Sequence, residues 1–140
     1  MYYLPVKSYM KKRDFELIKK WMLYALHDLD TAKIINLHLK DYTETICYHC
    51  QQAVEKALKA YLIYLEIDFK KSHSLEYLLN LIGLKDEFSD EWYEMASKLE
   101  NYAVEIRYPD VAVFPSDEEI INAIEIAEKF HNLILEKIKT

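Results

Sequence analysis

The sequence predicts an all-α protein, an up-and-down four-helix bundle with one additional short helix. Two observations predict this fold class. Apolar residues recur at three- and four-residue intervals over long stretches rich in lysine and glutamate, and no stretch alternates apolar and polar residues as a half-buried strand would. A chain of 140 residues, 51% of them apolar, can bury one sizeable core, so we expect a single domain over residues 1–140.

The first long helix is predicted from about Lys12 to Leu39. Its apolar stripe consists of Phe15, Ile18, Met22, Ala25, Leu29 and Ala32. Residues 1–11, which precede it, are rich in aromatic residues and contain Pro5, so we expect an irregular N-terminal arm. A short polar connection, with Thr43 as the capping hydroxyl, makes the next helix an antiparallel neighbour.

The second helix, which begins near Thr43 and runs to about Glu66, has the widest apolar arc and is predicted to lie at the centre of the bundle. Its apolar arc comprises Ile46, Cys50, Ala53, Val54, Ala57, Tyr61, Tyr64 and Leu65, and its polar arc comprises His49, Gln52, Glu55, Lys56 and Lys59. The spacing of Glu55 and Lys59 predicts a surface ion pair. A solvated face explains the polar arc as well as a binding site does.

Three further helices follow. A short one is predicted over Ser74 to Ile82, with Gly83 as its left-handed cap. A fourth begins after Ser89 and is ended by Pro109. Residues 116–119, with the sequence Ser-Asp-Glu-Glu, form a capping box that begins the last helix.

Composition excludes several classes of function. A net charge of -6 argues against a generally basic nucleic-acid-binding surface, and a single glycine excludes glycine-rich phosphate loops. The longest apolar runs are far shorter than the roughly 20 residues of a membrane span, and residues 1–14 contain no secretory apolar core, so we expect a cytoplasmic protein. Cys47 and Cys50 lie mid-helix on the apolar side, which favours buried thiols over a metal or redox pair.

Two short segments could carry chemistry. Arg107 is one of only two arginines and stands at a predicted helix end, where its planar fork could bind phosphate or carboxylate. It could equally cap helix carbonyls and pair with Asp110 or Glu105. His73 precedes a helix start, where an imidazole and backbone donors could hold an anion. The alternative is a serine cap beside a solvent-facing histidine.

Four segments in this order resemble the HEPN domain (higher eukaryotes and prokaryotes nucleotide-binding). They are Trp21, Ala25, Asp28, Leu29 and Ala32; Gln52-Ala-Val-Glu-Lys-Ala-Leu-Lys-Ala60; His73-Ser-Leu75; and Arg107-Tyr-Pro109. The resemblance covers about Trp21 to Ile134. It implies a helical bundle that forms a homodimer, binds a nucleotide or RNA, and pairs with a separate minimal nucleotidyltransferase in a module resembling a toxin and antitoxin.

The same resemblance suggests the site residues. Many HEPN relatives are metal-independent ribonucleases, in which an arginine is followed four to six residues later by a histidine. Here those positions after Arg107 hold Val111, Ala112 and Val113, so the proton-transfer group of that motif is absent. The sequence therefore favours a binding module over an enzyme, with no metal and no cofactor. Its expected ligand-binding residues are Arg107, Tyr108, His73, Lys56, Gln52 and His49.

Two alternatives stay open. The chain could be a divergent metal-independent endoribonuclease, with Arg107 clamping the phosphate and Tyr108 or His73 transferring the proton. It could also be a purely structural dimerisation module. In that case its contacts would come from aromatic-rich faces such as Tyr2, Tyr3, Trp92 and Tyr93.

Overall fold

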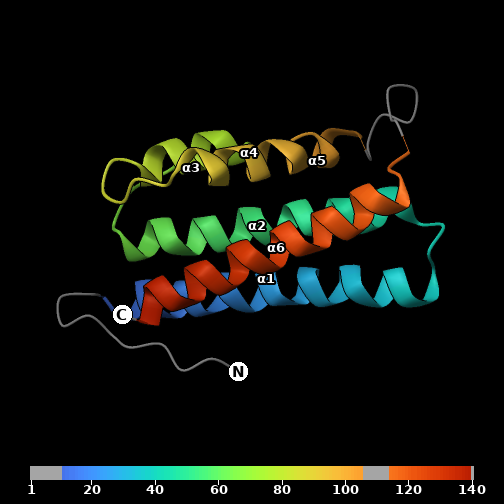
Figure 1. Ribbon diagram of the computed structural model, residues 1–140. Helices are drawn as coiled ribbons and strands as arrows, with labels where there is room; N and C mark the ends of the chain where they lie inside the picture. The colour runs from blue at the N-terminus through green and yellow to red at the C-terminus, as the bar shows by residue number, and fades with distance from the viewer. Residues whose placement is uncertain (1–10, 106–113, 140) are drawn as a thin grey trace.

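The helices predicted from the sequence are present in a computed structural model, which describes residues 11–105 and 114–139. Within these residues there are six helical segments and no strand. They are α1 (Lys12–His38), α2 (Thr43–Tyr64), α3 (Leu75–Ile82), α4 (Asp90–Leu99), α5 (Tyr102–Glu105) and α6 (Asp117–Lys139). The bundle positions are taken by α1, α2, α4 continued by α5, and α6, with α3 as the additional short helix, which confirms the predicted fold class (Figure 1).

Helix α2 lies at the centre of the bundle. In Figure 1, α3, α4 and α5 lie on one side of it and α1 on the other, while α6 packs across both α1 and α2. From Ile46 to Leu62 nearly every α2 side chain is buried, including Cys47 and Cys50. Burial raises the pKa of the Cys50 thiol well above its usual value. These two cysteines therefore pack in the core, as the sequence indicated.

The polar arc of α2 differs from its prediction. Glu55 and Lys59 do form the expected ion pair, with 3.0 Å between Lys59 Nζ and Glu55 Oε2, but they are only 3% and 7% exposed. The Trp21 ring of α1 lies 5.5 Å from the Lys59 ammonium, and His73 covers Glu55 from the α2–α3 connection. The prediction of a surface pair was wrong because these covering residues come from other segments of the chain.

Helices α1 and α6 pack on α2 through apolar stripes, and in the stripe predicted for α1 only Phe15 is partly buried. Ile18, Met22, Ala25, Leu29 and Ala32 of α1 are buried, as are Ile120, Ala127, Phe130, Ile134 and Ile138 of α6. Trp92 of α4 meets Phe130 edge to face, with 5.0 Å between the ring centroids. Each such large side chain contributes about 1.5–3 kcal/mol through burial. No helix in the described ranges combines the length and the apolar character that crossing a membrane requires.

Two predicted helix starts are confirmed by their hydrogen bonds. The Ser116 hydroxyl accepts the Glu119 N–H at 3.2 Å, and the Glu119 carboxylate accepts the Ser116 N–H at 3.4 Å, which is a reciprocal capping box. Ser74 caps α3 by accepting the Tyr77 N–H at 3.2 Å. Thr43 was expected to cap α2, but Tyr42 holds that position and makes no side-chain cap bond.

The predicted left-handed cap at Gly83 was wrong. Gly83 has right-handed geometry, with φ of -57°, and the residue with positive φ is Glu66, at 60°. Glu66 ends α2 in a Schellman motif, in which Ile67 N–H donates to Leu62 O at 2.9 Å and Glu66 N–H donates to Ile63 O at 3.0 Å. This motif satisfies two of the helix's terminal carbonyls at the cost of a strained non-glycine residue.

The fourth helix also ends earlier than expected. Instead of continuing to Pro109, which lies outside the described residues, it ends at Leu99, and α5 begins at Tyr102. At the break, the Glu100 carboxylate accepts the Leu75 and Glu76 N–H groups at 2.8 and 3.0 Å. The break therefore lets Glu100 cap the start of α3, a contact across 25 residues.

Replacing Glu66 with glycine should stabilise the fold. Glycine adopts positive φ without the Cβ clash. In urea unfolding, the free energy of unfolding of Glu66→Gly should therefore exceed that of Glu66→Ala by about 1 kcal/mol. The alanine variant is the matched control, because it removes the same carboxylate and keeps the strain. Equal midpoints for the two variants would show that the conformation at residue 66 costs nothing.

Candidate functional site

Two buried carboxylates organise the polar side of α2. The first is Asp28 of α1, which accepts a hydrogen bond from His49 Nδ1 at 2.8 Å and another from Lys56 Nζ at 2.5 Å. His49 and Lys56 are two helical turns apart on one face of α2, so Asp28 lies between them. Burial by itself raises the pKa of Asp28, but the hydrogen bonds and charges of His49 and Lys56 outweigh it and leave that pKa below its usual value.

The second carboxylate is Glu55. Its Oε1 accepts from His73 Nδ1 at 2.9 Å and from Gln52 Nε2 at 3.3 Å, and its Oε2 accepts from Lys59 Nζ at 3.0 Å. Three donors therefore satisfy a carboxylate that is almost completely removed from water. Gln51 adds a bond from its Nε2 to the His73 backbone carbonyl at 2.9 Å, so α2 holds both the ring and the backbone of His73.

His73 is the most accessible of these groups, with a side chain that is 56% exposed. Because a carboxylate only accepts hydrogen bonds, Nδ1 must carry the proton that it donates to Glu55. The other ring nitrogen, Nε2, is then an acceptor in the neutral ring and a donor in the charged ring. A fixed imidazole of this kind can bind an anion or transfer a proton.

The backbone donors beside His73 are already occupied. We expected N–H groups at the start of α3 to hold an anion together with the imidazole, but the Glu100 carboxylate accepts the Leu75 and Glu76 N–H groups. The Ser74 hydroxyl accepts the Tyr77 N–H and serves as the ordinary cap. An external anion at this position would therefore depend on side chains rather than on the helix terminus.

The structure brings four of the six predicted ligand-binding residues into one polar strip. It contains two groups: His49 and Lys56 contact Asp28, and Gln52 and His73 contact Glu55. The other two, Arg107 and Tyr108, lie outside the described residues. Sequence reasoning predicted only the Glu55–Lys59 pair and gave Asp28 no role in the site, although Asp28 does interrupt the apolar stripe of α1.

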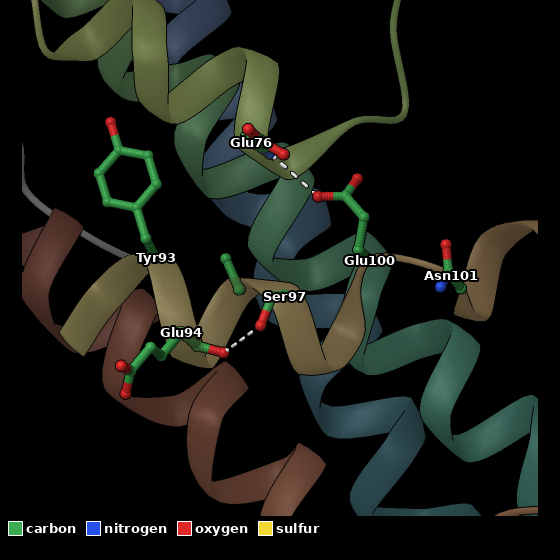
Figure 2. Close-up of a pocket in the computed structure, with 7 residues that line it drawn as sticks. Glu76, Tyr93, Glu94, Ser97, Glu100 and Asn101 are labelled. Carbon is green, nitrogen blue, oxygen red and sulfur yellow. Dashed lines mark hydrogen bonds between the residues drawn. The ribbon is translucent and has the colours of Figure 1, made fainter. Parts of the chain in front are cut away.

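A pocket between α3 and α4 is separate from this strip (Figure 2). It is lined by Glu76, Tyr93, Glu94, Ala96, Ser97, Glu100 and Asn101. Burial, followed by the charges of Glu87, Glu76 and Asp90, raises the pKa of Tyr93. The carboxylates of Glu76, Glu94 and Glu100 in the lining make this pocket unfavourable for phosphate. Within the described ranges, no group of three or more His, Cys, Asp or Glu side chains is arranged to hold a metal ion.

Removing the Asp28 carboxylate should destabilise the fold in a pH-dependent way. Its pKa in the folded chain is below the ordinary 3.8, so its ionisation stabilises the fold above pH 3.8 and that contribution disappears as the pH falls through the lowered value. Asp28→Asn, measured by urea unfolding at neutral pH, should cost about 2 kcal/mol, because the Lys56 ammonium and the His49 ring lose their charged partner.

The exposed Asp30→Asn on the same helix is the matched control and should change stability by less than about 0.5 kcal/mol. The difference in the free energy of unfolding between wild type and Asp28→Asn should become smaller below pH 3.8. If that difference in the free energy of unfolding stays constant from neutral to acidic pH, the role assigned to Asp28 is contradicted.

Comparison with known proteins identifies the family. The HEPN domain pattern matches residues 18–138. A protein of Methanocaldococcus jannaschii named "Putative toxin MJ1304" is 32% identical over 114 residues, which cover 76% of this chain and 70% of that protein.

Two solved structures share the fold. The crystal structure of ST0689, described as an archaeal HEPN homologue, superimposes with a TM-score of 0.71 and 26% identity, covering 93% of this chain and 100% of that one. The crystal structure of TT1696 from Thermus thermophilus has a TM-score of 0.74 and 27% identity, covering 86% of this chain and 97% of that one. The sequence pattern quoted above and the helical bundle agree with these matches, and the chain belongs to the HEPN domain family.

Proposed function

We propose that this chain is a nucleotide- or RNA-phosphate-binding module, a homodimer that pairs with a separate minimal nucleotidyltransferase in a toxin–antitoxin-like system. Family membership supports the proposal, as does the similarity to an archaeal protein whose name describes a toxin. In this proposal Arg107 supplies a planar fork for a phosphate group, with Tyr108 beside it. The polar strip of α2 supplies the remaining contacts.

The observation that carries the proposal is the exposed imidazole of His73, fixed by the buried Glu55. In the charged ring, Nε2 can donate to a phosphate oxygen without first losing conformational freedom, because the opposite ring nitrogen is already held. Gln52 would act indirectly, since it is buried and contacts Glu55.

Lys56 and His49 would have a secondary role. Both donate to Asp28, so a phosphate would have to share them with that carboxylate. One carboxylate between two cationic groups still leaves the local charge positive whenever His49 is protonated. The main phosphate contacts are therefore assigned to His73 and Arg107, with Lys56 and His49 adding electrostatic attraction.

The His73–Glu55 pair also favours a second function, a divergent metal-independent endoribonuclease. A carboxylate that orients an imidazole and stabilises its charged form is a recurring arrangement for general acid–base chemistry. In this reading Arg107 clamps the scissile phosphate, and His73 or Tyr108 transfers the proton. The pair would replace the histidine that is absent after Arg107.

The purely structural alternative has less support. One of its proposed interface aromatics, Trp92, packs on Phe130 and Phe88 inside the bundle, with ring centroids 5.0 and 6.0 Å apart. Tyr2 and Tyr3 lie outside the described residues. A dimerisation module also gives no reason for a carboxylate to hold a solvent-exposed imidazole.

Arg107→Ala should weaken binding of nucleoside triphosphates and short RNA by about tenfold or more, measured by calorimetry, because the bidentate phosphate contact is lost. His73→Ala should weaken it by about threefold. Arg13→Ala and His38→Ala are matched controls, because they remove exposed groups of the same types elsewhere. Wild-type affinity in Arg107→Ala would remove Arg107 from the site.

An RNA cleavage assay with chelator present separates binding from catalysis. The binding module predicts no cleavage of structured or unstructured RNA by purified wild-type protein, even at high concentration. Cleavage that is lost in both Arg107→Ala and His73→Ala would instead establish the endoribonuclease. Cleavage that survives both substitutions would come from a contaminant and would count for neither function.

A further inference from the structure

One end of the bundle carries most of the exposed large apolar side chains. Of the nine such side chains among the described residues, six lie where α1 ends and α6 begins. We call this surface the end face; it comprises Ile34, Leu37, Leu39, Tyr42, Phe114 and Ile121. Leu37, Ile121 and Phe114 are 70%, 56% and 77% exposed, which is high for side chains of this size.

The two helices place these residues together. Helices α1 and α6 run in opposite directions, so the C-terminal end of α1 and the N-terminal end of α6 lie at the same end of the bundle (Figure 1). An ion pair between Lys33 Nζ and Glu128 Oε1, 2.6 Å long, fixes their register. Leu37 lies one turn from Lys33 toward this end, and Ile121 lies two turns from Glu128 in the same direction. Both apolar side chains therefore lie toward this end of the bundle, one on each helix.

The surroundings of the end face are acidic. Residues 33–44 and 114–128 contain seven carboxylates and two lysines, and Lys98 of α4 lines a pocket with Ile121. The carboxylates are Asp41, Glu44, Asp117, Glu118, Glu119, Glu125 and Glu128. Carboxylates therefore outnumber lysines around this apolar surface.

The apolar side chains and the carboxylates around them together indicate which kind of partner fits the end face. If a second copy of the chain docked through the same face, two acidic rims would be brought together, and like charges across an interface are costly. A basic surface has the complementary sign, and its apolar side chains could cover Leu37 and Ile121. A partner with both features gains steering from the charges and affinity from the apolar contact.

We propose that the end face is the docking surface for a partner protein that presents apolar anchors surrounded by lysine and arginine. The inference rests on the partner binding proposed above and names the face that would perform it. The end face and the His49–His73 strip consist of different residues, since the strip centres on Asp28 and Glu55. Partner docking and phosphate binding would then use different surfaces.

The probe for the test is a synthetic amphipathic helix of leucine and lysine, titrated into the ¹⁵N-labelled full chain and followed by NMR. Amide shifts should concentrate in residues 33–44 and 114–128 and should weaken as salt is raised. Leu37→Ser combined with Ile121→Ser should lower the affinity about tenfold. The matched control is Leu17→Ser with Leu84→Ser, two exposed leucines away from this end, which should keep wild-type affinity.

Three results would overturn the inference. Amide shifts spread over the whole surface, or an equal loss in the control variant, would mean non-specific attraction to an acidic protein. A wild-type dimer that becomes a monomer in Leu37→Ser/Ile121→Ser, measured by light scattering, would make a second copy the occupant. NMR cross-relaxation between Ile121 and residues 106–113 would show that the same chain covers the end face, which would then not be free for a partner.

The experiment also separates this inference from the proposed phosphate binding. Leu37→Ser/Ile121→Ser should bind short RNA like wild type, and Arg107→Ala should bind the peptide like wild type. Peptide binding at the end face without any RNA binding would leave the docking surface standing and end the phosphate proposal. RNA binding that depends on Arg107, without localised peptide shifts, would support the phosphate proposal and end the proposal of a docking surface.

Discussion

The buried Glu55 carboxylate is the interaction on which the rest of the site depends. Its donors come from the turn of α2 before it, the turn after it, and the α2–α3 connection. Leaving such a charge unpaired inside a protein costs several kcal/mol, on the order of 3–5 when one partner is removed. The connection is therefore held against α2, and Gln51 secures the His73 carbonyl as well. The position of an exposed imidazole is thus set by a charge that solvent does not reach.

Asp28 performs a similar task on the α1 side of the same helix. It binds His49 and Lys56, so that the middle of α2 is lined by two carboxylates with cationic or imidazole partners. This arrangement explains why a helix buried on most sides keeps so many polar residues: each one is satisfied by a neighbour. In the functions that we propose, the strip would bind phosphate and the acidic apolar end of the bundle would bind a basic partner.

The sequence allowed prediction of the helices, their apolar stripes and the capping box at Ser116, because these follow from local spacing. It also indicated the Glu55–Lys59 pair, but not its burial, since Trp21 and His73 cover it from distant segments. The end of α4 at Leu99 depends on the contact of Glu100 with the start of α3. The cap at Glu66 depends on backbone hydrogen bonds, which no side chain in the sequence indicates. The predictions for Arg107 and Tyr108 concern residues outside the described ranges and stay predictions.

The most direct test of the central claim is the ¹⁵N chemical shifts of the His73 ring, measured with and without a nucleoside triphosphate. The Glu55 contact predicts that Nδ1 keeps its proton throughout, and phosphate binding predicts that Nε2 changes its shift on addition of the nucleotide. In Glu55→Gln, the tautomer preference should weaken and the response of Nε2 should shrink. A nucleotide that binds the protein while both His73 nitrogens keep their shifts would contradict the assignment of His73 to the phosphate site.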